Sequence, residues 1–205
     1  MTGMNLNYRQ RVWSLTLIMV ISLIIFLGIG LNLIKATLVD SSKREIQSVL
    51  AFAVHNANVF VEKAERGDMP RQEAEIQVVK LLSNMQHEHA YVWANDSDAI
   101  ARVHIRPEKI GVFQSSYLRH ITALSDEDII FREATNLKPF SNKKIFKING
   151  ITRLPDWNWV IGYGVYLDDI NTLLWKYMKT YTLTVFLICT LIWAGCFYLL
   201  QNKKQ

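Results

Sequence analysis

The chain has 205 residues, half of them hydrophobic, and a formal net charge of +5. This length allows one compact domain together with membrane segments. The positive charge does not indicate a nucleic-acid-binding surface, because the stretch 35–179 carries 19 basic and 18 acidic residues and is nearly neutral. The remaining basic residues flank the two most apolar parts of the chain: Arg9, Arg11, Lys203 and Lys204.

Two uncharged runs have the length of membrane-spanning helices. Residues 13–34 form a run of 22 residues and residues 180–200 one of 21. As helices they would be about 33 and 31 Å long, which matches the roughly 30 Å hydrocarbon core of a bilayer. We predict transmembrane helices over 13–34 and 178–200. The first run is too long for a signal peptide and no A-x-A-like site follows it, so we expect an uncleaved anchor.

The distribution of charge predicts the topology. Basic residues concentrate where each run faces a chain terminus, and the positive-inside rule places such segments in the cytoplasm. We therefore expect residues 1–12 and 201–205 in the cytoplasm, residues 35–177 in the periplasm, and the protein in a bacterial inner membrane. Both cysteines, Cys189 and Cys196, lie in the second run, so the central domain has neither a disulfide nor a thiolate metal site.

The first part of the central domain has helical periodicity. Apolar residues recur at spacings of three, four and seven from Lys35 to about Arg66, with no Gly or Pro from position 32 up to Arg66. The first membrane helix is therefore predicted to continue as one long rod that ends at Gly67-Asp68. A second helix is predicted over 71–85.

After residue 85 the pattern changes to short strands. We predict strands over 90–94 and 100–105 joined by the polar turn 95–98, a helix over 125–134, strands over 144–152 and 159–166, and a helix from 168 to 178. This order predicts an α+β domain in which helices pack on an antiparallel sheet.

Two segments resemble single-Cache sensor domains. The run YVWANDSDAIARVHIRPEKIG (91–111) is similar to their first hairpin, and LPDWNWVIGYGVYLDDI (154–170) to their closing strand. The resemblance covers roughly residues 35–175. It implies a PAS-like fold with a long N-terminal helix and a pocket for a small molecule, often an organic acid. It also implies a place in front of a chemoreceptor, kinase or cyclase, and we expect a homodimer formed through the N-terminal helix.

Strand alternation and the resemblance together suggest the ligand contacts. Tyr91 and Trp93 share one face of their strand, and Arg102, His104 and Arg106 are predicted to share a face of the next. Aromatic walls with cationic and hydrogen-bonding groups suit an anionic ligand. The alternatives are core packing for the aromatic residues, a solvated face for the arginines and a structural role for the histidine. The predicted contacts are Tyr91, Trp93, Arg102, His104, Arg106, Lys147 and Tyr163, with Tyr166 on the face opposite to Tyr163.

The sequence favours a sensor over an enzyme. It contains no G-x-S-x-G, no Gly-rich phosphate loop and no paired catalytic carboxylates. His87-Glu88-His89 lacks the H-E-x-x-H spacing of a helical metal site, so we predict neither metal nor cofactor. No output domain follows the second apolar run, so a sensor would act through a separate signalling protein or be a truncated receptor. The competing hypotheses are a scaffold that dimerises without a ligand and a structural part of an envelope machine.

Overall fold

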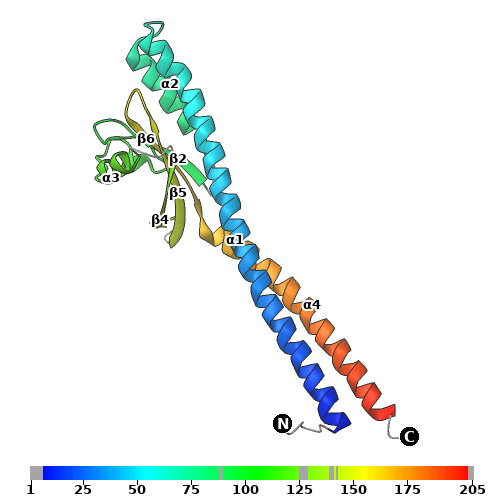
Figure 1. Cartoon of the computed structure of the whole chain (residues 1–205). Helices are drawn as coiled ribbons and strands as arrows, with labels where there is room; N and C mark the ends of the chain where they lie inside the picture. Colours follow the sequence, from blue (N-terminus) through cyan, green and yellow to red (C-terminus); the bar gives the residue numbers. More distant parts are fainter. Residues whose placement is uncertain (1–6, 88–89, 125–128, 139–140, 142, 203–205) are drawn as a thin grey trace. The chain divides into compact units, whose positions relative to one another are not determined.

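The computed structural model describes residues 7–87, 90–124, 129–138, 141 and 143–202. The chain divides into two compact units, one made of residues 1–38 with 170–205 and the other of residues 39–169. Helix α1 (Tyr8–Glu65) and helix α4 (Leu167–Asn202) each run from one unit into the other without a break (Figure 1). The predicted long N-terminal helix is thereby confirmed.

The first unit is a pair of apolar helices. Both α1 and α4 are long and apolar enough to cross a membrane, by length and composition. Their half-buried side chains recur every three or four residues, the period at which two helices pack with a left-handed twist. These side chains are Val20, Leu23, Leu27, Leu31 and Ile34 on α1 and Val185, Cys189, Ile192 and Cys196 on α4. At one end of this seam the Thr16 hydroxyl lies 3.2 Å from Cys196 Sγ.

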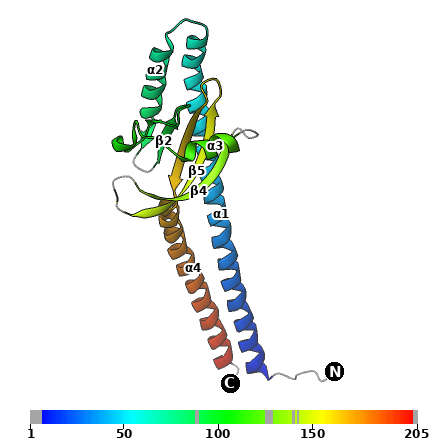
Figure 2. The ribbon, with the colours of Figure 1, turned by 90° about the vertical axis from the view of Figure 1, so that its left-hand side faces the viewer.

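The second unit is an α+β domain, as predicted. Its antiparallel sheet has the strand order β1-β2-β6-β5-β4. Strand β3 pairs with the end of β2, at Ala94 and Asn95. Helix α2 folds back beside the last turns of α1 (Figure 2). The elements in chain order after α1 are α2 (Arg71–Ser83), β1 (Gln86–His87), β2 (Ala90–Asn95), β3 (Ala101–Val103), a 3-10 turn (Pro107–Lys109), α3 (Ser116–Ala123), β4 (Ile129–Leu137), β5 (Lys144–Leu154) and β6 (Trp159–Tyr166).

Each face of the sheet has its own apolar cluster. On one face, buried side chains of α1 and α2 pack against the sheet, and Gly150 permits this close approach because a Cβ there would overlap Ile46. On the other face, Tyr117 of α3 packs with Ile130 and Ile151, and its hydroxyl donates a hydrogen bond of 2.7 Å to the Asn158 carbonyl. The sheet is therefore covered by α1 and α2 on one side and partly by α3 on the other.

Glycine ends the long helix where the sequence predicts. Gly67 has φ of +79°, a left-handed conformation that side chains disfavour. The amides of Gly67 and Asp68 donate to the carbonyls of Ala64 and Lys63, at 3.0 and 2.8 Å. These bonds satisfy carbonyls that the helix end leaves without a partner.

The predicted helix over 125–134 is wrong from residue 129 onward. Residues 129–137 form strand β4, which pairs with β5 along its whole length, Ile129 opposite Thr152 and Leu137 opposite Lys144. The only helix described in this region is α3, over 116–123, while residues 125–128 lie outside the described part. The β-branched and aromatic run Ile129-Ile130-Phe131 favours a strand, and pairing with β5 outweighs the local helical signal.

The strand predicted over 100–105 is shorter and contains a bulge. Strand β3 covers only Ala101–Val103, because the chain turns toward the 3-10 turn that begins at Pro107. Asn95 pairs with Ala101 and Ala94 with Val103, which leaves Arg102 as an extra residue on its strand. A bulge of this kind breaks the alternation of side chains between the two faces.

Candidate functional site

The candidate site lies on the face of the sheet opposite α1. Strand register brings its central residues together: Tyr91 of β2 pairs with Gly164 of β6, and Lys147 of β5 pairs with Tyr166 of β6. Gly164 makes this arrangement possible, because a Cβ there would overlap Lys147 and the Asn149 side chain. The stem of Lys147 thus occupies the space that a side chain at position 164 would need.

Lys147 is a buried cation held by aromatic rings. Its residue is only 1% exposed, and its Nζ lies 3.8 Å from the Tyr91 ring centroid and 5.3 Å from that of Tyr166. Within the described part of the chain no carboxylate forms an ion pair with it. Burial lowers the pKa of Lys147 to about 7. A buried ammonium without a counter-ion is unfavourable unless a partner arrives.

His104 packs against Tyr91 and is a neutral hydrogen-bond donor. Its ring centroid lies 5.4 Å from that of Tyr91, and its Nδ1 accepts a hydrogen bond of 2.9 Å from the Arg106 amide. Burial, and then the positive charges of Lys147, Lys109 and Arg106, lower the pKa of His104 to about 4. The imidazole is therefore neutral near pH 7. Because Nδ1 is an acceptor, its proton is on Nε2, which can donate to another group.

The two tyrosines complete a set of donors. Tyr91 and Tyr166 share a hydrogen bond, and burial raises the pKa of both phenols. Both hydroxyls therefore keep their protons at neutral pH. The charge of Arg106 lowers the pKa of each phenol and of His104, so its guanidinium acts on the same cluster.

This cluster is rich in donors and positive charge. The ammonium of Lys147 and the imidazole of His104 both lie against the ring of Tyr91, and ammonium, N–H and hydroxyl groups bind carboxylates with charge-assisted hydrogen bonds. No group of three or more His, Cys, Asp or Glu side chains suited to a metal ion occurs among the described residues. Of the triplet His87-Glu88-His89, the last two lie outside that part of the chain.

Trp93 extends the same face beyond Tyr91. It lies opposite Gly162, and its indole occupies the space that a Cβ at Gly162 would need. The ring is half-buried, and the imidazole of His120 on α3 lies 5.8 Å from it between centroids. The absence of a side chain at Gly162 thus leaves room for Trp93, and its absence at Gly164 leaves room for Lys147.

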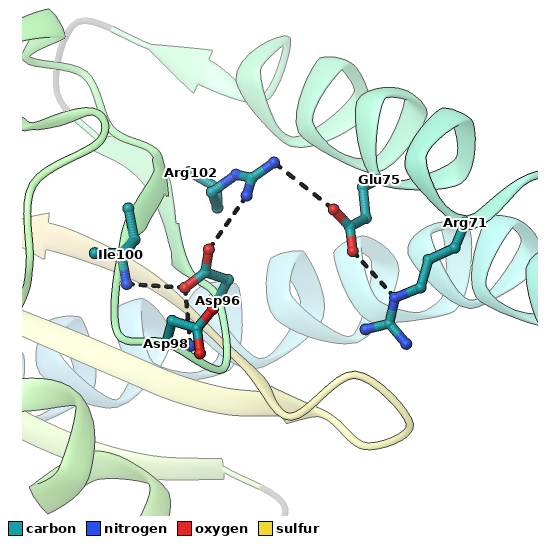
Figure 3. Close-up of polar contacts among 6 residues, drawn as sticks. All are labelled: Arg71, Glu75, Asp96, Asp98, Ile100 and Arg102. Atoms are coloured by element: carbon teal, nitrogen blue, oxygen red, sulfur yellow. Dashed lines mark hydrogen bonds and ion pairs between the residues drawn. The ribbon is translucent and has the colours of Figure 1, made fainter.

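Arg102 does not share a face with His104, contrary to the sequence prediction. The bulge turns its guanidinium toward α2, where it forms ion pairs with Asp96 at 3.2 Å and Glu75 at 3.7 Å and lies over the Trp159 ring (Figure 3). Glu75 also accepts a hydrogen bond of 3.1 Å from Arg71. Arg102 therefore links the β2–β3 turn to α2.

From this network we expect Arg102→Gln to affect stability and not ligand affinity. Losing these half-exposed ion pairs should lower the free energy of unfolding by about 1 kcal/mol. Affinity for a small carboxylate should change by less than about twofold, since the guanidinium points away from Lys147. Thermal unfolding and calorimetry of the full chain in detergent measure both. A large loss of affinity at unchanged stability would contradict this reading.

Tyr163 also lies on the other face. Its hydroxyl donates a hydrogen bond of 3.2 Å to Glu45 of α1, and its pKa is raised to about 12 by burial and by this carboxylate. The residue on the site's face is Tyr166, which strand alternation predicts opposite Tyr163 and which is not among the predicted contacts. A signal was present: Gly162, Gly164 and Tyr166 alternate along one face, and glycines often mark a place where other groups approach the backbone.

The structure thus gathers part of the predicted set. Tyr91, His104 and Lys147 meet in one cluster with Tyr166, and the charge of Arg106 reaches it. Trp93 lies next to this cluster on the same face. Arg102 and Tyr163 lie on the opposite face, in contact with α2 and α1.

Comparison with known proteins gives a consistent picture. A family model described as Cache domain matches residues 30–180. The methyl-accepting chemotaxis protein McpP of Pseudomonas putida KT2440 is 22% identical over 185 residues, which cover 82% of this chain and 33% of that protein. The chain therefore spans about a third of the length of this curated relative.

Solved sensor domains share the fold at low sequence identity. A periplasmic sensor domain of a chemotaxis protein has a TM-score of 0.57 and 21% identity, covering 63% of this chain and 97% of its own. A Cache chemosensory domain whose structure was solved for carboxylic acid recognition has a TM-score of 0.53 and 18% identity, covering 64% and 97%. A methyl-accepting chemotaxis protein from Vibrio parahaemolyticus has a TM-score of 0.52 and 22% identity, covering 69% and 99%.

Proposed function

The chain belongs to the Cache domain family, and we propose that it is a membrane-anchored sensor of small carboxylic acids, without enzymatic activity of its own. One observation carries the proposed ligand class. Lys147 is a buried cation without a carboxylate partner among the described residues, and Tyr91, Tyr166 and His104 place donors around it. A small carboxylate supplies the negative charge and the acceptors that this cluster lacks. The solved Cache domain that recognises carboxylic acids supports the same class.

The test is a ligand screen on the full chain in detergent micelles. Acetate, propionate, lactate and pyruvate are added separately and the unfolding temperature is measured, because a ligand that binds the folded state raises it. Calorimetry then measures the affinity of each acid that stabilises the protein. Methylamine and an uncharged amide such as acetamide are the controls. If the amide stabilises the protein as well as acetate does, the carboxylate is not what the site recognises.

The affinity for acetate is expected to fall as the pH rises. The pKa of Lys147 is about 7, so the ammonium that binds the anion is present below pH 7 and is lost above it. His104, with a pKa of about 4, stays neutral from pH 6 to 8 and adds no dependence. If only the charged lysine binds, affinity falls about tenfold from pH 6 to pH 8. Calorimetry in buffers of different ionisation enthalpy should show proton uptake at pH 7. An affinity that is flat or rises over this range would rule out the lysine as the anion's partner.

The anchoring is proposed from the two apolar helices. Side chains on their outer faces are strongly exposed, such as Phe26 at 70% and Leu191 at 73%, which suits contact with lipid. With the basic residues at both chain ends in the cytoplasm, the Cache domain would lie in the periplasm of a two-pass inner-membrane protein. Cysteine-accessibility labelling in intact cells, at Ser97 of the β2–β3 turn, tests this orientation.

Signal passage would use the continuity of the last strand with α4. Tyr166 of the site is followed directly by α4, whose first residue is Leu167. A ligand that favours one arrangement of the site would bias α4, by no more than its difference in affinity for the two arrangements. The output would come from a separate signalling protein or from a receptor of which this chain is part. We further propose a homodimer along α1, where the outward side chains Phe52 and Val59, seven residues apart, are 60% and 44% exposed.

A further inference from the structure

An ion pair ties the start of α4 to the end of strand β4. Lys138 directly follows β4, and its Nζ donates a hydrogen bond of 2.9 Å to Oδ2 of Asp168, the second residue of α4. The two side chains are 15% and 36% exposed, so the pair is partly shielded from water. The backbone amide of Lys138 donates to the Lys143 carbonyl at 3.0 Å, which fixes Lys138 at the β4–β5 turn. The ion pair therefore connects this turn to the first turn of α4.

The same ion pair lies beside the carboxylate site. The Nζ of Lys138 is 5.8 Å from the ring centroid of Tyr166, and the Nζ of Lys147 is 5.3 Å from the same centroid. Burial and the neighbouring Tyr91 raise the pKa of the Tyr166 phenol, and the charge of Asp168 raises it further. The lysine of the site and both partners of the ion pair thus act on one fully buried tyrosine.

An anion at the site acts on the two partners in opposite directions. A carboxylate bound at Lys147 attracts the ammonium of Lys138 and repels the carboxylate of Asp168. Both effects weaken the ion pair, and salt screens them little because the groups are partly or fully buried. Coupling between two sites is reciprocal, so opening the ion pair must favour the bound anion by the same factor.

We propose that Lys138 and Asp168 form a latch that holds the first turn of α4 to the β4–β5 turn, and that a carboxylate bound at Lys147 loosens this latch. The inference rests on the carboxylate site proposed at Lys147. The latch is closed in this structure. When the anion binds, the ion pair separates and the first turn of α4 loses this tie to the sheet. The ligand thereby acts on α4 through its charge, in addition to the backbone link from Tyr166.

Hydrogen exchange of the full chain in detergent micelles, read by mass spectrometry, tests the latch with acetate as the probe. Saturating acetate is expected to speed exchange of the amides of residues 167–173 about fivefold, the size of a modest coupling. Amides of the sheet should slow, because the ligand stabilises the fold. Lys138→Met should speed exchange at 167–173 without acetate, and acetate should not speed it further. Lys144→Met, at an exposed lysine of β5, is the matched control and should behave as the wild type.

The reciprocal effect is expected on affinity. Asp168→Asn removes the carboxylate that repels the ligand, so acetate should bind about fivefold more tightly than it binds the wild type. Calorimetry measures this change. Asp156→Asn, at an exposed aspartate of the β5–β6 turn, is the matched control and should leave acetate affinity unchanged. An ion pair with only a structural role predicts a different pattern, in which Asp168→Asn speeds exchange in α4 but does not strengthen acetate binding.

The outcomes separate this inference from the proposed function. If acetate binds but slows exchange at 167–173, or if Asp168→Asn binds acetate no more tightly than the wild type, the latch is not coupled to the site while the carboxylate site stands. If the wild type binds no small carboxylate, the site fails and the coupling with it. If Asp168→Asn does not fold, exchange in the wild type with and without acetate still decides the question.

Discussion

Replacing Lys147 by methionine is expected to lower the affinity for acetate about a hundredfold, the loss typical of a charge-assisted hydrogen bond in a buried place. Methionine has a similar length and fills the same space against Tyr91 and Tyr166, so the sheet should keep its shape. Calorimetry on the full chain measures the loss. Lys144→Met is the matched control, since Lys144 is an exposed residue of the same strand. Wild-type acetate affinity in Lys147→Met would refute the central role of this lysine.

The same variant is expected to be more stable than the wild type in the absence of ligand. The pKa of Lys147 is about 7 in the folded chain and 10.5 when unperturbed, so the unfolded chain binds more protons between these values. Wild-type stability should therefore rise with pH from 7 toward 10.5, and at pH 7 the buried amine destabilises the fold by about 4 kcal/mol. Lys147→Met should remove this cost and flatten the pH dependence. Urea unfolding at pH 7 and pH 9 measures both effects.

The second large effect is expected at Asp96, which holds the turn between the strands that carry Tyr91 and lead to His104. Its Oδ1 accepts hydrogen bonds from the amides of Asp98 and Ile100, at 3.1 and 2.9 Å, and its Oδ2 pairs with Arg102 (Figure 3). Asp96→Ala removes all three contacts from a residue only 7% exposed. The free energy of unfolding should fall by about 3 kcal/mol.

Two further variants show which part of the Asp96 contacts matters. Asp96→Asn keeps an oxygen for the two amides and loses the charge, so it should lose only about half as much stability. Ser97→Ala changes an exposed residue of the same turn and should have no measurable effect. Thermal unfolding of the full chain in one detergent ranks the three variants. If Asp96→Ala is as stable as Ser97→Ala, the turn does not depend on this carboxylate.

The sequence predicted the parts of the fold that depend on local pattern. The unbroken apolar periodicity before Gly67 predicted α1, and alternating residues with Pro155-Asp156 between them predicted β5 and β6. The strand β4 was missed because its residues carry both helical and strand signals. Its conformation is decided by pairing with β5, which no local pattern shows.

Strand alternation predicted the face of a side chain correctly where the strand is regular, and it was misleading where the strand is bulged. Tyr91 and Trp93 share a face because β2 is regular. Arg102 lies on the other face because a single bulged residue shifts the phase of β3, and a bulge has no fixed sequence signature. Lys147 and Tyr166 become neighbours only through the register of β5 with β6, so their contact follows from the sheet and not from either strand alone.

Gly164 constrains how this domain can diversify. The space that a side chain would need at position 164 is filled by the stem of Lys147, so the two positions cannot vary independently. Among homologues that bind other molecules, we expect the glycine and the lysine to be replaced together, with a larger residue at 164 accompanied by a shorter one at 147. An engineer who wishes to give this sensor a new ligand should accordingly randomise the two positions as a pair.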